Sequence, residues 1–289
     1  MSDSLTSAAW RIFVASMIIL QIIYVDVFFI EPNCIQVEHV RIVNARLARA
    51  LEGVRVVQLS DLHLQNLGFI ETSLIRVIER VRPDLIIVTG DVIESRQGMQ
   101  AAIDIFSLFE PRFRTYIIAG EAVGDQWMSE SGSSKSWDDA DVTVLHQKAI
   151  RLNVKDREDA AFWLVNPSRP DTLHALIKDI PENEPIIVVN HRPDIVKQSA
   201  IDRADLVLAG HTHGGQVGVS FIRRLFPYAE RSPYMAGLFK VRDTLLYVNR
   251  GVSSKNIFRF LCRPEVTIFE FSSTGTGRKP KVLGQDETG

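Results

Sequence analysis

Two histidines stand one residue apart in a glycine-rich turn that directly follows a short apolar run. The run ends at Ala209, and the turn reads Gly210-His211-Thr212-His213-Gly214-Gly215-Gln216. Neutral imidazole is the commonest metal ligand in proteins, and glycines let a backbone pass close to a bound ion. The turn could therefore hold a metal, although close histidines and glycines also occur in ordinary turns.

Three other apolar runs also end on a side chain that can bind metal. Residues 54–59 lead to Asp61 and His63, residues 85–89 lead to Asp91, and residues 186–189 lead to His191. Short β-branched runs bounded by Gly, Pro or Asp are typical of strands buried on both faces. We therefore expect these ligands to converge at strand ends.

The mixture of oxygen and nitrogen donors indicates the kind of metal. Carboxylates together with neutral imidazoles suit manganese, iron or zinc, whereas a cysteine-rich set would indicate structural zinc. The two cysteines, Cys34 and Cys262, lie far apart in the sequence and away from every motif. We expect them to be buried small apolar groups rather than ligands.

With these motifs in this order, the chain resembles the calcineurin-like metallophosphoesterase family. The resemblance rests on the Asp-Leu-His, Gly-Asp, Asn-His-Arg-Pro and Gly-His-Thr-His-Gly-Gly-Gln blocks, and it extends over about residues 54–271. It is greatest for a membrane-anchored bacterial branch of the family. The fold that it implies is α/β, a four-layer α/β/β/α sandwich behind an N-terminal anchor helix.

Carried over position by position, the resemblance implies two divalent metal ions, with manganese expected and iron or zinc as alternatives. Asp61, His63 and His213 would bind one ion, His191 and His211 the second, and Asp91 would bridge them. A shared carboxylate offsets the repulsion between two close cations and holds a hydroxide between them. That hydroxide would attack phosphorus, which places Asp91 and His211 in the catalytic centre.

The third motif departs from the family pattern. Family members normally carry Gly-Asn-His-Asp or Gly-Asn-His-Glu, in which the Asn binds the second metal and the His assists the leaving group. This chain has Gly120-Glu121-Ala122-Val123-Gly124-Asp125 instead. Glu121 can replace the amide as a hard oxygen ligand. Ala122 cannot donate a proton, and the loss of a positioned general acid typically costs ~10²–10⁴ in rate.

This loss matters less for some substrates than for others. An alkoxide leaving group needs a proton, whereas a phosphate that leaves from a phosphoanhydride is already a stable anion. We therefore expect an anhydride substrate to be favoured over an alkyl phosphodiester. Asp125 or His146 could alternatively supply the missing acid, which makes Asp125 a candidate catalytic residue beside Glu121.

Three residues are candidates for substrate contact. Arg231 and Arg250 could grip phosphate oxygens because a guanidinium fork matches phosphate geometry, and Gly215 would let the backbone approach the phosphate. Residues 221–228 mix aromatic, aliphatic and basic side chains. This segment would either contact lipid or cap the core.

Residues 12–30 form the most apolar stretch, which is interrupted by Gln21 and Asp26. As a helix it is about long enough to cross a ~30 Å hydrocarbon core, so we interpret residues 1–31 as a membrane anchor. A signal peptide is disfavoured because no small-residue cleavage site follows. A buried or interfacial helix is the other alternative, since a carboxylate at Asp26 is costly in lipid.

Basic residues near the apolar stretch bear on its orientation. Arg11 precedes it, and Arg41, Arg46 and Arg49 follow it. Positive charge favours the cytoplasmic side, so we expect the catalytic domain on the cytoplasmic face of a bacterial inner membrane.

Length and composition suit one domain with an appendage. The chain has 289 residues, of which 46% are hydrophobic and 24% charged, enough for one large core. We expect the catalytic domain over residues 32–273 and a disordered tail over 274–289, where small and charged residues prevail. The net charge of -2 gives no basic face for nucleic acid. The oligomeric state is not predicted.

Apolar spacing indicates how the motifs are connected. A helix is predicted over residues 70–81, and further helices over about 99–108, 172–178 and 193–203. Strands are predicted at about 237–241, 245–248 and 266–271. The order is that of βα units followed by a mainly β closing half.

The sequence thus predicts a membrane-tethered, metal-dependent hydrolase of a phosphoester or, by preference, a phosphoanhydride of a lipid or nucleotide-lipid. UDP-2,3-diacylglucosamine is one candidate substrate, because some anchored members that the resemblance implies cleave its pyrophosphate in lipid A synthesis. Two alternatives stay open. One is a general phosphodiesterase acting on phospholipid or cyclic nucleotide, and the other is a non-catalytic metal-binding scaffold at the membrane.

Overall fold

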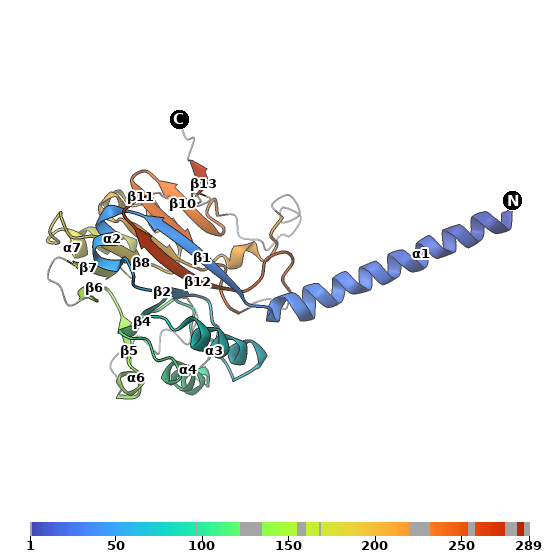
Figure 1. Ribbon diagram of the computed structural model, residues 1–289, viewed down its shortest axis with the longest axis horizontal. Coiled ribbons are helices and arrows are strands. Elements are labelled where there is room, and N and C mark those ends of the chain that lie inside the picture. The colour runs from blue at the N-terminus through green and yellow to red at the C-terminus, as the bar shows by residue number, and fades with distance from the viewer. Residues whose placement is uncertain are drawn as a thin grey trace.

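Two mixed β-sheets pack face to face, and a long N-terminal helix projects away from them (Figure 1). The computed structural model describes residues 2–95, 97–121, 135–154, 160–167, 169–219, 232–253, 258–274 and 282–285. In spatial order the first sheet contains β1 (Gln36–Val43), β12 (Glu265–Ser272), β2 (Val56–Leu59), β3 (Leu85–Val88), β4 (Arg114–Ile118) and β5 (Val142–Leu145). The second contains β13 (Val282–Gln285), β10 (Gly237–Val241), β11 (Thr244–Val248), β9 (Leu206–Ala209), β8 (Ile186–Val189), β7 (Ala161–Asn166) and β6 (Lys148–Asn153).

The central strands that precede the ligand motifs run parallel within each sheet. In the first sheet β2, β3, β4 and β5 are parallel neighbours, and in the second β7, β8 and β9 are. Helices α3 (Phe69–Val81) and α4 (Gly98–Ser107) connect the strands of the first sheet. Parallel neighbours end at the same edge of a sheet, so the loops that carry the motifs emerge together.

Alternate residues of the parallel strands enter different hydrophobic cores. Ile86 and Val88 of β3 pack with residues of α3 and α4, whereas Leu85 and Ile87 pack in a second core together with Leu208 of β9. Side chains of a strand alternate between its two faces, and a strand buried on both faces is apolar throughout. The second core therefore lies between the sheets.

A third core covers the outer face of the second sheet. It joins β8 and β9 residues to side chains from α7 (Leu173–Ile177), η5 (Pro193–Lys197) and η6 (Ser199–Arg203). Helix, sheet, sheet and helix layers thus enclose three apolar layers, which confirms the predicted four-layer sandwich. Figure 1 shows α3, α4 and α6 (Lys135–Asp139) together on one side, with α7 across the sheets from them.

The predicted elements agree with the structure except in detail. The helices at 70–81 and 99–108 and the three closing strands are present. The single helix predicted over 193–203 is instead two 3₁₀ helices, η5 and η6. They are separate because Gln198 between them has extended backbone angles, φ −70° and ψ 137°.

The C-terminal segment contains a strand that its composition did not predict. Within the expected disordered tail, β13 pairs in parallel with β10, with Val282 opposite Leu238 and Gln285 opposite Lys240. An edge strand presents unpaired backbone groups that such a segment can satisfy. The boundaries 1–31, 32–273 and 274–289 otherwise stay predictions.

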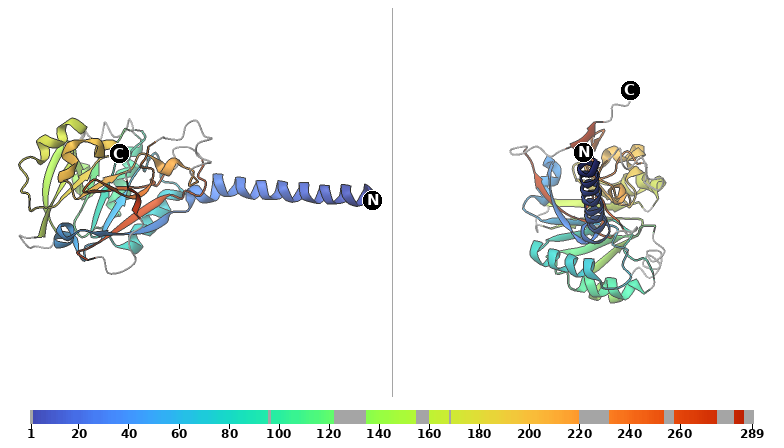
Figure 2. Two further views of the ribbon diagram at one scale, coloured as in Figure 1. Left: turned by 90° about the horizontal axis from the view of Figure 1, so that it is seen from above. Right: turned by 90° about the vertical axis from the view of Figure 1, so that its right-hand side faces the viewer.

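The N-terminal helix passes into the domain without a linker. Helix α1 (Ser2–Val25) continues as a π-helix, η1 (Asp26–Ile30), then as a 3₁₀ turn, η2 (Glu31–Asn33), before β1 begins. The most apolar 18-residue window of the stretch Ala8–Asn33 has a mean hydropathy of 2.3, and the stretch is by length and composition able to cross a membrane. Figure 2 shows α1 leaving one end of the domain without folding back. Its large apolar side chains, such as Ile12 and Ile22, are exposed.

The core between the sheets makes a testable contribution to stability. Leu164 of β7 is fully buried in that core, so Leu164→Ala should lower the free energy of unfolding by about 2–5 kcal/mol. Leu108→Ala is the matched control, because Leu108 is exposed and such changes stay within about 0.5 kcal/mol. Urea unfolding of the full chain in detergent measures both. Equal effects of the two variants would contradict the assigned core.

Candidate metal centre

Loops at the ends of five parallel strands bring the predicted ligands together. Asp61 and His63 follow β2, Asp91 follows β3, Glu121 follows β4, His191 follows β8, and His211 and His213 follow β9. The first sheet thus delivers mainly carboxylates, and the second delivers histidines. The centre lies where the loops of the two sheets meet.

The backbone at this centre is held in an unfavourable conformation. Five of the seven residues have positive φ between 45° and 71°, namely Asp61, His63, Asp91, His211 and His213. A non-glycine residue in the left-handed region costs of order 1–3 kcal/mol, and such residues cluster at functional sites. The surrounding fold therefore imposes the arrangement of these side chains.

Two glycines that precede ligands allow the loops to approach the carboxylates. A Cβ on Gly210 would lie 1.8 Å from Ser60 Oγ and 2.5 Å from Asp61 Oδ2. A Cβ on Gly120 would lie 2.2 Å from Asp91 Oδ1. Any other residue at these positions would push the loop or the carboxylate away. In the sequence, the only signal of this close approach was the position of the two glycines directly before His211 and Glu121.

Asp61, His63 and His213 form one buried ligand group, with donor atoms within 4.8 Å of one another. His213 Nε2 lies 3.3 Å from Asp61 Oδ1. Within the described part of the chain, Asp61 Oδ1 and His63 Nε2 are buried without a hydrogen-bond partner. Buried polar atoms normally have partners, and a cation would satisfy both. The donor set therefore fits a metal ion.

Asp61, Asp91 and His191 form a second buried ligand group. Asp91 faces both groups, with Oδ2 3.6 Å from His63 Nε2 and Oδ1 3.4 Å from His191 Nε2. This is the arrangement that a bridging carboxylate needs. Asp61 also belongs to both groups, whereas the resemblance implied that it serves only the first ion. His211 lies beside the second group, with Nδ1 3.1 Å from His191 Nε2, and its assignment as a ligand stays a prediction.

Outer contacts orient three of the imidazoles. The Nδ1 atom of His191 lies 2.9 Å from the carbonyl oxygen of Thr89, and that of His213 lies 3.2 Å from the carbonyl oxygen of Ser253. His63 Nδ1 lies 2.5 Å from Glu94 Oε2. In each pair Nδ1–H donates, so the hydrogen bond leaves Nε2 as the lone-pair donor to a metal. No motif marked Glu94, and the sequence reasoning missed it.

Burial and neighbouring charges compete at these ligands. Burial opposes the charge of Asp61, but His213, His191 and the Ser60 hydroxyl hold the pKa of its carboxyl below the usual value. Burial likewise disfavours protonated His191, but the hydrogen bond that its ring donates to Asp91 and the charges of Asp61 and Asp91 raise its pKa to about 9. Burial dominates at His213 and lowers its pKa to about 4. A cation here competes with a proton for the same carboxylates.

Glu121 lies at the mouth of the centre rather than inside either group. Its backbone N–H donates to Asp91 Oδ1, its Oε1 accepts from Arg192 Nη1 at 2.9 Å, and its Oε2 lies 3.9 Å from His211 Nδ1. Its side chain is 50% exposed, which leaves it room to move. Its assignment as a ligand stays a prediction. Ala122 and Asp125 lie outside the described residues.

The residues predicted to contact substrate differ in the partners that the structure gives them. Arg250 donates from Nε to Glu265 at 2.5 Å and from Nη2 to Glu38 at 2.6 Å. Much of its guanidinium group is therefore already engaged in ion pairs. Phosphate binding by Arg250 stays a prediction. Gly215 lies in the histidine turn η7 (His213–Gly215), where its N–H donates to the Thr212 carbonyl. Arg231 and residues 221–228 lie outside the described residues.

A buried arginine supports the loop beside the centre. Arg259 is fully buried and donates to the carbonyl oxygens of Arg250, Gly251, Ser253 and Cys262. A buried charge is tolerated only with such partners. The Ser253 carbonyl also accepts from His213, so Arg259 acts on a candidate ligand through a shared acceptor. The sequence showed only an isolated arginine between aromatic residues.

The motifs and this geometry identify the class of protein. The family described as calcineurin-like phosphoesterase matches residues 54–215, which is more than half of the chain. The chain therefore belongs to the calcineurin-like phosphoesterase family and is a metal-dependent phosphoesterase. The two buried ligand groups support divalent cations as its cofactors.

Curated relatives are similar over most of the chain. An uncharacterized metallophosphoesterase of Bacillus subtilis, YkuE, is 28% identical over 85% of this chain and 88% of its own length. The phosphodiesterase YaeI of Escherichia coli is 32% identical over 75% of this chain and 81% of its own. The UDP-2,3-diacylglucosamine pyrophosphatase LpxG of Chlamydia trachomatis is 24% identical, over 83% and 90%. The similarity to that branch is thus distant.

The Glu94 contact should tune metal affinity. Glu94→Gln keeps an acceptor for His63 but removes the charge that makes the imidazole a stronger donor, so the affinity for Mn²⁺ should fall about 10–100-fold. Competition with a chelator measures this without a substrate. Glu79→Gln is the control, because Glu79 is exposed on α3. An unchanged affinity in Glu94→Gln would show that the contact does not act on the metal.

The close approach of Gly210 should be essential for metal binding. Gly210→Ala forces Ser60 or Asp61 to move, so bound Mn²⁺ should fall by at least one ion per chain. Gly53→Ala is the control, because a Cβ at Gly53 meets nothing within 4 Å, although its positive φ, which Gly210 does not share, adds backbone strain there. Elemental analysis should find full metal in Gly53→Ala. Full metal in Gly210→Ala would contradict the proposed packing.

Proposed function

We propose that this protein is a membrane-associated phosphohydrolase that uses two divalent cations to cleave a phosphoanhydride or phosphoester of a lipid or nucleotide-lipid. The proposal of a lipid substrate rests on the position of the loop 259–262. This loop contacts both the candidate ligand His213 and the end of the anchor. Cys262 Sγ lies 3.4 Å from the carbonyl oxygen of His213, and Cys262 N–H donates to Glu31 at the end of the anchor. The candidate metal centre is therefore next to the end of the N-terminal helix, which is the candidate membrane span.

The ligands fit Mn²⁺, with Fe or Zn as alternatives, because hard carboxylates and neutral imidazoles are combined. Asp61, His63 and His213 would hold one ion, and Asp91, His191 and His211 the other. When bound, such ions neutralise phosphoryl charge and lower the pKa of water. His211 is 17% exposed, against 4–7% for the other three histidines. It is therefore the histidine placed to contact substrate.

The altered third motif favours an anhydride. Arg192 pairs with Glu121 and so balances the negative charge that Glu121 adds in place of the usual amide. Ala122 offers no proton, which an anhydride needs least. UDP-2,3-diacylglucosamine is a candidate substrate, because it is a lipid with two acyl chains and because its pyrophosphate is an anhydride. The name of the chlamydial relative supports this candidate, and with it a role in lipid A synthesis.

A general phosphodiesterase is the second candidate, because the 32% identical relative from Escherichia coli is named a phosphodiesterase. Phospholipid or cyclic nucleotide would then be the substrate. The same metal centre serves both proposals. They differ in the leaving group that the site accepts.

The proposed location is the bacterial inner membrane, with the catalytic domain on its cytoplasmic side. Helix α1 is the candidate span, and Arg41, Arg46 and Arg49 on the domain side supply the positive charge expected there. A nucleotide-lipid substrate made in the cytoplasm would be reached from this side.

The leaving group decides between the proposals. With Mn²⁺, the full chain should cleave an anhydride much faster than an alkyl diester, and rates on diesters should fall as the leaving-group pKa rises. Ala122→His should raise the alkyl diester rate by ~10²-fold or more and hardly change the anhydride rate. His211→Ala, as a negative control, should remove both activities.

Stopped assays over a series of leaving groups provide the measurement. A rate that does not depend on leaving-group pKa would rule out the role assigned to Ala122. Metal binding without hydrolysis of any ester or anhydride would favour the non-catalytic scaffold.

A further inference from the structure

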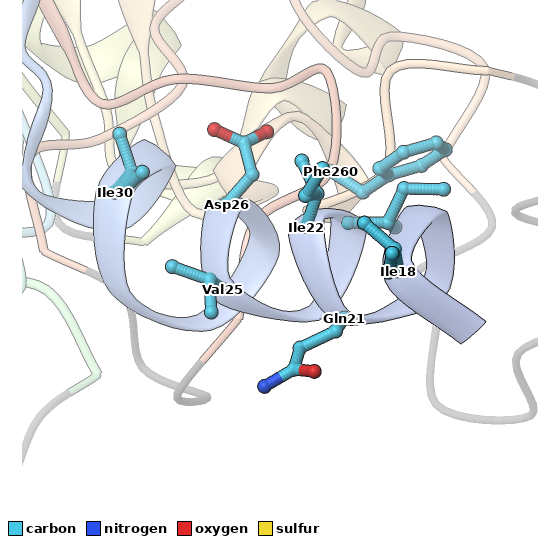
Figure 3. A pocket seen from close by; sticks show the side chains of 8 residues that line it. Ile18, Gln21, Ile22, Val25, Asp26, Ile30 and Phe260 are labelled. Atoms are coloured by element: carbon cyan, nitrogen blue, oxygen red, sulfur yellow. The ribbon is translucent and has the colours of Figure 1, made fainter. Parts of the chain in front are cut away.

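A groove lies between the end of the anchor helix and the catalytic domain. Seven anchor residues between Ile18 and Ile30 line it, together with Phe260 of the domain, and its volume is about 440 Å³. Figure 3 shows Ile18 and Ile22 beside the Phe260 ring. Of the described residues that line it, all except Gln21 and Asp26 are apolar. The size lies within the ~300–1,000 Å³ of ligand pockets.

Hydrogen bonds on both sides of Phe260 fix the two walls to each other. Arg259 N–H donates to the Val27 carbonyl at 3.0 Å. Leu261 N–H and Cys262 N–H donate to the two carboxylate oxygens of Glu31, at 2.8 and 2.5 Å. Glu31 is buried, so water does not compete for these bonds. The groove is therefore preformed.

The domain wall of the groove is continuous with the metal ligands. Phe260 N–H donates to the Gln216 carbonyl, and Gly218 N–H donates to the Phe260 carbonyl, both at 2.9 Å. Gln216 is three residues after His213, and three residues span at most about 10 Å. The backbone of Phe260 is thus hydrogen-bonded to a residue that lies within about 10 Å of a candidate metal ligand.

The surroundings identify the kind of molecule that fits. All seven anchor residues belong to the candidate membrane span Ala8–Asn33, so the part of the groove that precedes Asp26 would open on hydrocarbon. Phe29, Ile30 and Leu261 are at least half exposed at its domain end and extend this apolar surface. Asp26 lies beside them and indicates the border with water, because a carboxylate is costly deeper in lipid.

We infer that this groove binds an acyl chain of the lipid substrate and so presents the substrate's phosphate to the metal centre. The inference rests on the proposed function, since it names the part of that substrate which the protein recognises. The groove accounts for recognition without a separate lipid-binding domain. It makes Ile22 and Phe260 residues that determine specificity.

Filling the groove tests the inference. Ile22→Trp places a bulky apolar group against Phe260, and Leu20→Trp is the matched control, because Leu20 is similarly exposed but lies about 200° around the helix. The full chain in phosphatidylcholine nanodiscs is assayed on a diacyl-lipid pyrophosphate and on water-soluble bis(p-nitrophenyl) phosphate. Ile22→Trp should raise KM for the lipid roughly tenfold with kcat unchanged. Its rate on the soluble ester should stay that of the wild type.

Leu20→Trp should match the wild type on both substrates. Equal effects of the two tryptophans, or no effect of Ile22→Trp, would overturn the inference. A loss of the soluble activity in Ile22→Trp would also overturn it, because the change would then act on the metal centre.

Photolabelling gives a readout that does not need turnover. A diacyl pyrophosphate with a diazirine at the end of one acyl chain, present at low mole fraction, should label Phe260 and Ile22 in preference to Leu20. Equal labelling of Phe260 by diazirine phosphatidylcholine would assign the groove to bulk lipid and overturn the inference. If the wild type cleaves only the soluble ester, the proposed substrate fails, whereas the labelling still decides whether the groove selects this lipid.

Discussion

The buried carboxylate of Asp61 is the constraint on which the rest of the structure depends. Its Oδ2 accepts from the Ser60 hydroxyl and the His211 N–H, while Oδ1 faces His213 without a hydrogen bond from the described residues. Its own N–H and carbonyl bind Gly90 and Ser253. One residue thus joins loops of both sheets, and its buried charge needs a cation nearby.

The same constraint links the metal centre to the N-terminal helix. The loop 259–262 donates to the Ser253 carbonyl, contacts the His213 carbonyl, and donates from its backbone N–H groups to Glu31 at the end of the N-terminal helix. A movement of the anchor relative to the domain would therefore disturb a candidate ligand. This hydrogen-bonded junction differs from a linker that makes no contact with the domain.

Burial explains what could be predicted from the sequence. Strands such as β3 and β8 are buried on both faces, so their apolar runs and the ligands that follow them are visible locally. β1 is only partly buried and shows no such run, and no strand was predicted there. Glu94, Arg259 and Glu31 could not be found, because their roles arise from contacts between distant segments. Arg250 has the charge expected for phosphate, but folding places Glu38 and Glu265 beside it.

Anomalous diffraction from crystals of the full chain grown with Mn²⁺ tests the central claim most directly. Two peaks should appear, one coordinated by Asp61, His63 and His213, and one by Asp91 and His191, with a carboxylate shared between them. The account would be contradicted by a map that has no peak at Asp61, whether manganese is bound elsewhere in the protein or is not bound at all.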